Sequence, residues 1–139
     1  MTGALIAAEA ENWIDVPFRW QGRVKAGCDC KGLIAGVAKA CGRTEGDSVH
    51  ALAGDYHKGV DVARLKAGLA ELFDQVTERQ AGDILLVRMG GKAQHLAIFA
   101  PTQAKPDRVI EAMPTGPARV RPGRASLGRI DSIWRWREL

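Results

Sequence analysis

The first half of the chain alternates apolar and polar residues with the spacing of α-helices. Three stretches show this pattern, over residues 3–14, 29–41 and 62–73. Pro17 follows the first stretch, Gly42 follows the second, and Asp61 is suited to cap the third at its N-terminus. The apolar stripes comprise Leu5, Ile6, Ala10 and Trp13; Leu33, Ile34, Val37, Ala38 and Cys41; and Val62, Leu65, Leu69, Leu72 and Phe73. The pattern therefore predicts three amphipathic helices that each bury one face.

Two stretches between these helices lack a period. Residues 17–28 are rich in aromatic and small residues and are interpreted as a loop. Residues 43–60 contain Gly46, Gly54 and Gly59, and we expect a loop with one helical turn there.

The second half has the composition of β-strands. Short runs rich in β-branched and aromatic residues cover 83–87, 95–99, 108–112, 119–121 and 132–136, and Gly90-Gly91 marks a turn. Helices first and strands second predict an α+β fold, with the N-terminal helices packed on an antiparallel sheet. The length of 139 residues suits one domain over residues 1–139.

Composition supports a folded core and leaves the partner open. Hydrophobic residues make up 46% and charged residues 26%, and the net charge is +4. Six arginines lie near the C-terminus, where they could meet nucleic acid, an anionic cell-wall polymer or an acidic protein, or form a solvated surface. We favour the solvated surface, and no nucleic-acid docking motif is recognisable. The arginines are Arg119, Arg121, Arg124, Arg129, Arg135 and Arg137.

The N-terminal residues and the hydrophobic runs bear on location. Residues 1–13 lack a basic start and carry Glu9 and Glu11 where a signal peptide has an apolar stretch. No run approaches the length of a membrane span. We therefore expect synthesis in the cytoplasm, no membrane insertion, and delivery by another route for any role outside the cell.

Three cysteines raise the question of a reactive thiol. Cys28 and Cys30 are separated by one residue, a poor geometry for a disulfide. Cys30 stands at the start of the second predicted helix, where N–H groups and the helix dipole stabilise a thiolate. Gly32 removes side-chain bulk near the sulfur. Cys41 continues the apolar stripe as a core residue, and Cys28 is given no chemistry.

A cysteine nucleophile needs a base, and His95 is the best placed of three histidines. It begins a predicted strand after a Gly-rich turn, whereas His50 and His57 lie in the unpatterned loop. Glu111 lies in the next strand among apolar residues and would hold the imidazole in orientation. For both residues a purely structural role stays open: a buried histidine for His95 and the polar face of an edge strand for Glu111.

A zinc module is the alternative use of the cysteines. Cys28, Cys30, Cys41 and His50 supply enough ligands, but the Cys-x-Cys pair lacks the usual gap of two to four residues. We therefore expect no metal and no other cofactor.

Four segments resemble the NlpC/P60 family of papain-like cell-wall peptidases. Residues 17–22 (PFRWQG) are similar to its Pro-Tyr-x-x-Gly-Gly stretch, and residues 29–33 (DCKGL) to its Asp-Cys-Ser-Gly-Leu nucleophile motif. Residues 82–86 (GDILL) resemble its Gly-Asp-Leu strand. Residues 95–99 (HLAIF), with the successor strand 109–112, resemble its His-Val-Gly-Ile-Tyr strand. The Gly-Cys-Asp-Cys-x-Gly-Leu form is closest to the subgroup found in phage tails and gene transfer agents.

The resemblance implies a papain-like NlpC/P60 fold and hydrolysis of amide bonds in peptidoglycan stem peptides. It implies Cys30 as nucleophile, His95 as base and Glu111 as the orienting residue. The four candidate substrate-binding residues are Phe18, Trp20, Asp29 and Gly32. The subgroup implies a component of a phage-like tail that acts in the periplasm or cell wall, with tail-tip or hub proteins as partners.

Three departures from the family pattern count against full activity. Phe18 stands where the family has a tyrosine whose hydroxyl is thought to help bind the oxyanion. Gln21 replaces the first glycine of the pair, and Glu111 replaces the usual His, Asn or Gln. A structural tail-tip component that keeps the hydrolase fold with little activity is therefore the alternative function.

Overall fold

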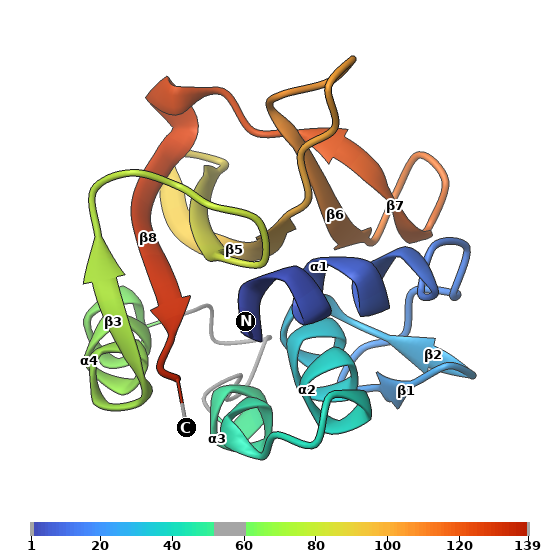
Figure 1. Ribbon diagram of the computed structural model, residues 1–139. Coiled ribbons are helices and arrows are strands. Elements are labelled where there is room, and N and C mark those ends of the chain that lie inside the picture. The colour runs from blue at the N-terminus through green and yellow to red at the C-terminus, as the bar shows by residue number, and fades with distance from the viewer. Residues whose placement is uncertain (1, 52–60, 139) are drawn as a thin grey trace.

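The structure is a computed structural model that describes residues 2–51 and 61–138. Its helices are α1 (Thr2–Glu11), α2 (Cys30–Ala40), α3 (Glu45–Ala51) and α4 (Val62–Leu72), with a short 3₁₀ helix η2 (Leu127–Arg129). Its strands are β1 (Arg23–Val24), β2 (Gly27–Cys28), β3 (Phe73–Val76), β4 (Ile84–Met89), β5 (Lys92–Phe99), β6 (Arg108–Met113), β7 (Arg119–Arg124) and β8 (Ile130–Trp136). Figure 1 shows their arrangement.

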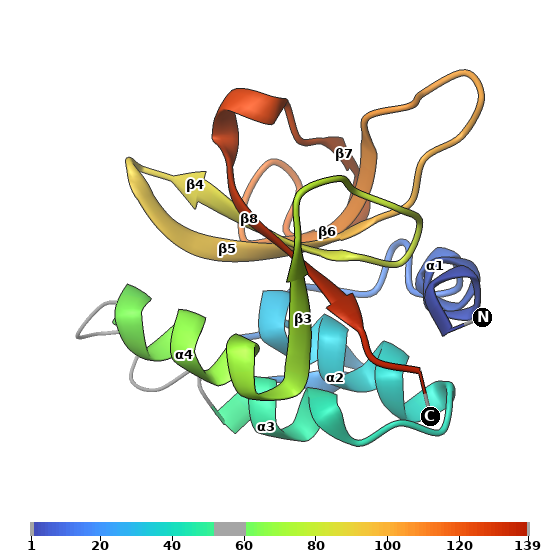
Figure 2. The same ribbon diagram turned by 60° about the vertical axis from the view of Figure 1, so that its left-hand side comes forward.

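The main sheet has six antiparallel strands in the order β3-β8-β4-β5-β6-β7. The α-helices α1, α2, α3 and α4 lie together on one side of this sheet, below it in Figure 2. The larger core lies between helices and sheet and includes Ile6, Leu33, Leu69, Leu96 and Trp134. A smaller apolar cluster that includes Leu85, Phe99 and Ile133 also packs in the sheet region. The α+β class and the packing of N-terminal helices on an antiparallel sheet are confirmed.

The second predicted helix and the cap of the third are where the sequence placed them. We expected α2 to begin at Asp29 or Cys30, and it begins at Cys30 with Asp29 as its N-cap. Gly42 follows its end with a positive φ of 76°. Asp61 caps α4, because its side chain accepts a hydrogen bond of 3.1 Å from the backbone N–H of Arg64. α1 is shorter than predicted and ends at Glu11, although Trp13 beyond it remains buried.

Three expectations about the elements were wrong. Phe73 does not extend the third helix: its backbone is extended and pairs with Trp136, so a sixth strand begins there. Residues 23–28 form the small β1–β2 hairpin inside the stretch interpreted as a loop. α3 has seven residues, more than the single turn expected, while residues 52–60 of that predicted loop lie outside the described residues.

Two local features of β5 differ from the sequence pattern. His95 is the fourth residue of β5 rather than its first. Val87 pairs with His95 whereas Arg88 pairs with Ala93, so Gln94 is one extra residue opposite β4. Such a bulge bends a strand and changes the direction of nearby side chains. The bulge thus lies directly beside the candidate base.

The C-terminal arginines bind carboxylates of the same chain. Arg135 contacts the buried carboxylate of Asp83 at 2.9 Å, and Arg137 contacts Asp74 at 3.0 Å. Arg124 lies 3.4 Å from Asp107. The first two pairs tie the end of β8 to the residue before β4 and to β3, and the third joins the end of β7 to the residue before β6. Part of the basic C-terminal stretch therefore serves the fold itself.

Candidate active site

The start of α2 is held by one buried carboxylate. Asp29 is the N-cap residue, and its Oδ1 accepts a hydrogen bond of 2.7 Å from the backbone N–H of Gly32. Its Oδ2 accepts a second bond of 2.8 Å from the N–H of Gln21. Asp29 is fully buried. It therefore fixes the helix start and the preceding loop relative to each other, with Cys30 at the first position of the helix.

An aromatic segment lies alongside the strand that leads into Cys30. The N–H of Cys28 donates to the carbonyl of Pro17, and the N–H of Arg19 donates to the carbonyl of Cys28, each at 3.0 Å. The rings of Phe18 and Trp20 meet edge to face with centroids 4.8 Å apart. Trp20 is 57% exposed, so this segment presents an aromatic surface near the helix start.

His95 and Glu111 are joined across neighbouring strands. The Nε2 of His95 and the Oε1 of Glu111 are 2.7 Å apart, from β5 and β6 respectively. His95 is 5% exposed and the Glu111 side chain 15%. With Nε2 bonded to the carboxylate, Nδ1 is the ring nitrogen left for Cys30.

Gly123 on β7 provides the space for Glu111. A Cβ at position 123 would lie 1.8 Å from Oε2 of Glu111. Any larger residue there would displace the carboxylate, so the position of Glu111 depends on this glycine.

Cys30 and His95 form a coupled acid–base pair. Burial by itself would raise the pKa of the Cys30 thiol, but the hydrogen bond with His95 and the charge of Lys31 outweigh it, and the pKa is lowered to about 7. Burial would lower the pKa of His95, but hydrogen bonds with Cys30 and Glu111 raise it to about 9. Between these values the favoured state is a thiolate beside an imidazolium.

The other two thiols behave in the opposite way. Burial is the main reason that the pKa of Cys28 is raised to about 12, with the negative charges of Asp29 and Cys30 adding to it. Burial also raises the pKa of Cys41. Cys41 is half-buried at the end of α2, at the edge of the core rather than within it as expected. Cys30 is thus the thiol placed for nucleophilic chemistry.

A profile of the NlpC/P60 family matches residues 15–118, which include the cysteine, the histidine and the glutamate of this site. This chain belongs to the NlpC/P60 family. Its α+β NlpC/P60 fold is that of the family's peptidoglycan hydrolases. A search of curated proteins found no match.

Solved structures agree with the family assignment. The NlpC/P60 domain of the peptidoglycan hydrolase SagA is 27% identical with a TM-score of 0.64, over 96% of this chain and 98% of that one. The peptidoglycan hydrolase RipB of Mycobacterium tuberculosis is 17% identical with a TM-score of 0.67, over 99% of this chain and 66% of that one. The Resuscitation Promoting Factor Interacting protein RipA, mutated at a histidine, is 18% identical with a TM-score of 0.64, over 99% and 63%.

Within this NlpC/P60 domain, two of the four candidate substrate-binding residues are fully engaged by the protein. A Cβ on Gly32 would lie 1.7 Å from the carbonyl oxygen of Gly22, so this glycine allows α2 to pack against the loop rather than clearing space for substrate. Its N–H is bonded to Asp29, which is itself buried. Asp29 and Gly32 therefore hold the start of α2 in place without facing the solvent. Phe18 and Trp20 are the two candidates with exposed surface.

The NlpC/P60 structure also brings forward Lys31 and the backbone of Gln21, which sequence reasoning missed. Lys31 is fully buried with its Nζ 3.9 Å from the Sγ of Cys30. A lysine in a helix is usually solvated, so the sequence carried no signal for this burial. Gln21 has a positive φ of 63°, a conformation that favours glycine and accounts for the glycine of the family pattern.

In the part of this NlpC/P60 domain that the structure describes, neither a metal-binding group nor the cavity at residues 104–108 and 122–124 coincides with Cys30, His95 and Glu111. Among residues 2–51 and 61–138, no three His, Cys, Asp or Glu side chains are grouped to hold a metal, and the Nε2 of His50 lies 3.0 Å from the carbonyl of Gln21. Within the same residues, no helix is long and apolar enough to span a membrane.

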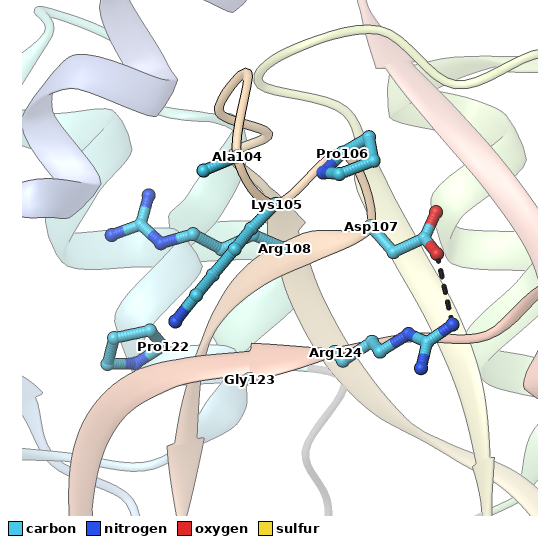
Figure 3. Close-up of a pocket in the computed structure, with 8 residues that line it drawn as sticks. All are labelled: Ala104, Lys105, Pro106, Asp107, Arg108, Pro122, Gly123 and Arg124. Carbon is cyan, nitrogen blue, oxygen red and sulfur yellow. Dashed lines mark hydrogen bonds and ion pairs between the residues drawn. The ribbon is translucent and has the colours of Figure 1, made fainter.

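A cavity of about 600 Å³ is lined by residues 104–108 and 122–124 (Figure 3). It adjoins the site through Gly123, which lies against Glu111.

Proposed function

We propose that this protein is a cysteine peptidase that hydrolyses amide bonds in the stem peptides of peptidoglycan. The observation that carries the proposal is the series of Cys30 at the N-terminus of α2, His95 on β5 and Glu111 on β6. Membership of the NlpC/P60 family supports peptidoglycan as the substrate. The structures of RipA mutated at a cysteine, a histidine and a glutamate involve the same three residue types.

The proposed reaction has an acylation step and a deacylation step. The Cys30 thiolate attacks the carbonyl carbon of the amide, and the oxygen takes up the negative charge. The N–H groups and the positive dipole end at the start of α2 favour that oxyanion. The imidazolium of His95 then protonates the leaving amine, and a thioester with Cys30 remains.

Deacylation reverses the role of the histidine. Neutral His95 takes a proton from water, the resulting hydroxide attacks the thioester, and the carboxylic acid product leaves as the thiol is restored. Glu111 accepts a hydrogen bond from Nε2 throughout and stabilises the imidazolium, as a carboxylate does in a catalytic triad. Phe18 supplies no hydroxyl to the oxyanion, so the backbone donors carry that role alone in this proposal.

The remaining candidate residues suit recognition. Trp20, with Phe18 beneath its edge, would contact the apolar faces of the substrate through its exposed ring. The buried residues Asp29 and Gly32 would act only by fixing the helix start. We expect Trp20→Ala to raise KM more than it lowers kcat.

The experiment is digestion of purified peptidoglycan by the wild type and by Cys30→Ala, with the fragments identified by mass spectrometry. We expect new amine and carboxyl ends in stem peptides from the wild type, and none from the variant. Cys28→Ala is the matched control, since it removes a neighbouring thiol and should keep activity. Identical fragments from wild type and Cys30→Ala, or no fragments from either, would overturn the enzymatic proposal.

We further propose that the peptidase is carried in a phage-like tail, made in the cytoplasm and delivered to the periplasm or cell wall. Support comes from the form of residues 27–33, GCDCKGL, which is closest to the phage-tail and gene transfer agent subgroup. Mass spectrometry of purified particles from the producing cells should find this chain together with tail-tip proteins. Its absence from particles would contradict this placement. Presence in particles without hydrolysis would favour the structural tail-tip role.

A further inference from the structure

The residue after the nucleophile has an unusual environment for a lysine. Lys31 lies in the first turn of α2, is fully buried, and has its Nζ 3.9 Å from the Sγ of Cys30. In the family motif a serine stands at this position, so the cation is a departure of this chain. The ammonium group is therefore placed beside the reacting sulfur by the fold, although the family pattern does not require it.

Burying an ammonium group at this point has a physical cost. Removal of a cation from water is unfavourable, and the N-terminus of a helix is the positive end of its dipole. An anion nearby reduces that cost, and a thiolate at Cys30 is such an anion. The arrangement therefore favours the deprotonated form of Cys30. The thiolate stabilises the buried ammonium group as much as the ammonium group stabilises the thiolate.

We propose that Lys31 is a second cation for the Cys30 thiolate, which stabilises the nucleophile directly and independently of the protonation of His95. The inference rests on Cys30 being the nucleophile. In a site with His95 alone, loss of the imidazolium proton would remove the partner charge. With Lys31 in place the sulfur keeps a positive neighbour at pH values where His95 is neutral.

Besides Lys31, titratable groups from β2, β5 and β6 and the N-cap of α2 surround the sulfur of Cys30. His95 faces it from β5, with Glu111 behind the imidazole on β6. Cys28 at the end of β2 stays protonated, since burial first and then nearby negative charge hold its pKa at about 12. The Asp29 carboxylate is directed to two backbone N–H groups. Beside a backbone hydrogen bond from Leu96, His95 and Lys31 are thus the two side chains whose contact with the thiol favours the thiolate.

The test measures the thiolate itself and needs no substrate. Iodoacetamide alkylation of Cys30 is followed as a function of pH by peptide mass spectrometry in the wild type, Lys31→Met and Lys31→Ser. We expect the midpoint of the alkylation profile to move upward by about one pH unit or more in both variants. Lys39→Met, in the exposed last turn of the same helix, is the matched control and should leave the midpoint unchanged.

A second background separates the two cations. In His95→Asn we expect Lys31 still to hold the midpoint down, and in the double variant with Lys31→Met we expect a higher midpoint, at or above the ordinary thiol value, because burial raises the pKa of the thiol. Equal midpoints in the wild type and both Lys31 variants would overturn the proposal. Circular dichroism at each pH checks folding, and the serine variant restores the family residue in case methionine packs poorly.

The outcome is distinct from that of the proposed function. If peptidoglycan is not cleaved but the alkylation midpoint shifts with Lys31, the role of the lysine stands and the substrate assignment fails. If peptidoglycan is cleaved and the midpoint does not shift, the function stands and the role of Lys31 fails.

Discussion

Cys28 and Cys30 are two residues apart, are both buried, and have opposite acid–base character. The pKa of Cys28 is raised to about 12, chiefly by burial, while that of Cys30 is lowered to about 7 against the effect of its own burial. Cys28 ends β2 and lies in the apolar core; Cys30 begins α2 and meets His95 and Lys31. Burial alone therefore does not make a thiol inert. The groups within hydrogen-bond distance of the sulfur decide whether the thiol ionises readily.

The largest expected effect comes from removing the histidine that distinguishes the two thiols. His95→Asn should lower the rate of peptidoglycan hydrolysis by about 10⁴-fold, because both proton transfers and the imidazolium partner of Cys30 are lost. The measurement is the initial rate of release of stem-peptide amines. His50→Asn is the control, since the Nε2 of His50 bonds to the loop carbonyl of Gln21, and should keep at least half the activity. Comparable rates for the two variants would remove His95 from the mechanism.

Glu111→Gln weakens the support behind the same imidazole. An amide still accepts a hydrogen bond from Nε2–H but no longer stabilises the positive charge, so we expect the hydrolysis rate to fall by about a hundredfold. The pKa of His95, raised partly by Glu111, should fall, and this can be followed by NMR of the ring protons. An unchanged His95 titration in Glu111→Gln would show that the carboxylate does not set the charge state of the site.

The pH dependence should separate Cys28 from Cys30 in one experiment. Because the pKa of Cys30 is lowered, its thiolate is present above about pH 7 and is lost as the pH falls through that value. Because the pKa of His95 is raised, the imidazolium is present below about pH 9 and is lost as the pH rises through it. Hydrolysis should therefore follow a bell between these limits, and alkylation of Cys30 should exceed that of Cys28 about tenfold or more near pH 8. Equal labelling of both thiols in the folded protein would contradict the difference in acid–base character between Cys28 and Cys30.

The smallest effect is on stability and concerns the residue between the two cysteines. Asp29→Ala removes two hydrogen bonds from a buried carboxylate and should reduce the free energy of unfolding by about 2 kcal/mol or more. Asp61→Ala, which removes the exposed cap of α4, should cost about 1 kcal/mol. Urea unfolding followed by circular dichroism gives both values. If the two substitutions reduced the free energy of unfolding by the same amount, the hydrogen bond between Asp29 and the N–H of Gln21 would contribute nothing to stability.

Residue periodicity and helix-start chemistry carried much of the fold. The start of α2 at Cys30, the cap at Asp61 and the strands around His95 and Glu111 follow from local preferences that act over a few residues. Phe73 shows the limit, since one apolar residue suits the end of a helix stripe as well as the start of a strand. Its pairing with Trp136 decided between them. Trp136 is distant in the chain, so no local pattern could reveal that contact.

The sequence by itself determined the order of α1, α2 and α4 and of the strands β4 to β8, the position of Cys30 at a helix start, and the residue types available as its partners. Only the tertiary structure decided that the pKa of Cys30 is lowered and the pKa of Cys28 is raised. His95 and Lys31 contact the Cys30 thiol, whereas the apolar core surrounds the Cys28 thiol. The tertiary structure also decided that Gly32 and Asp29 hold the start of α2 in place, and that Gly123 leaves room for Glu111. These outcomes depend on distances between segments far apart in the chain, and electrostatic and packing energies follow those distances rather than sequence spacing.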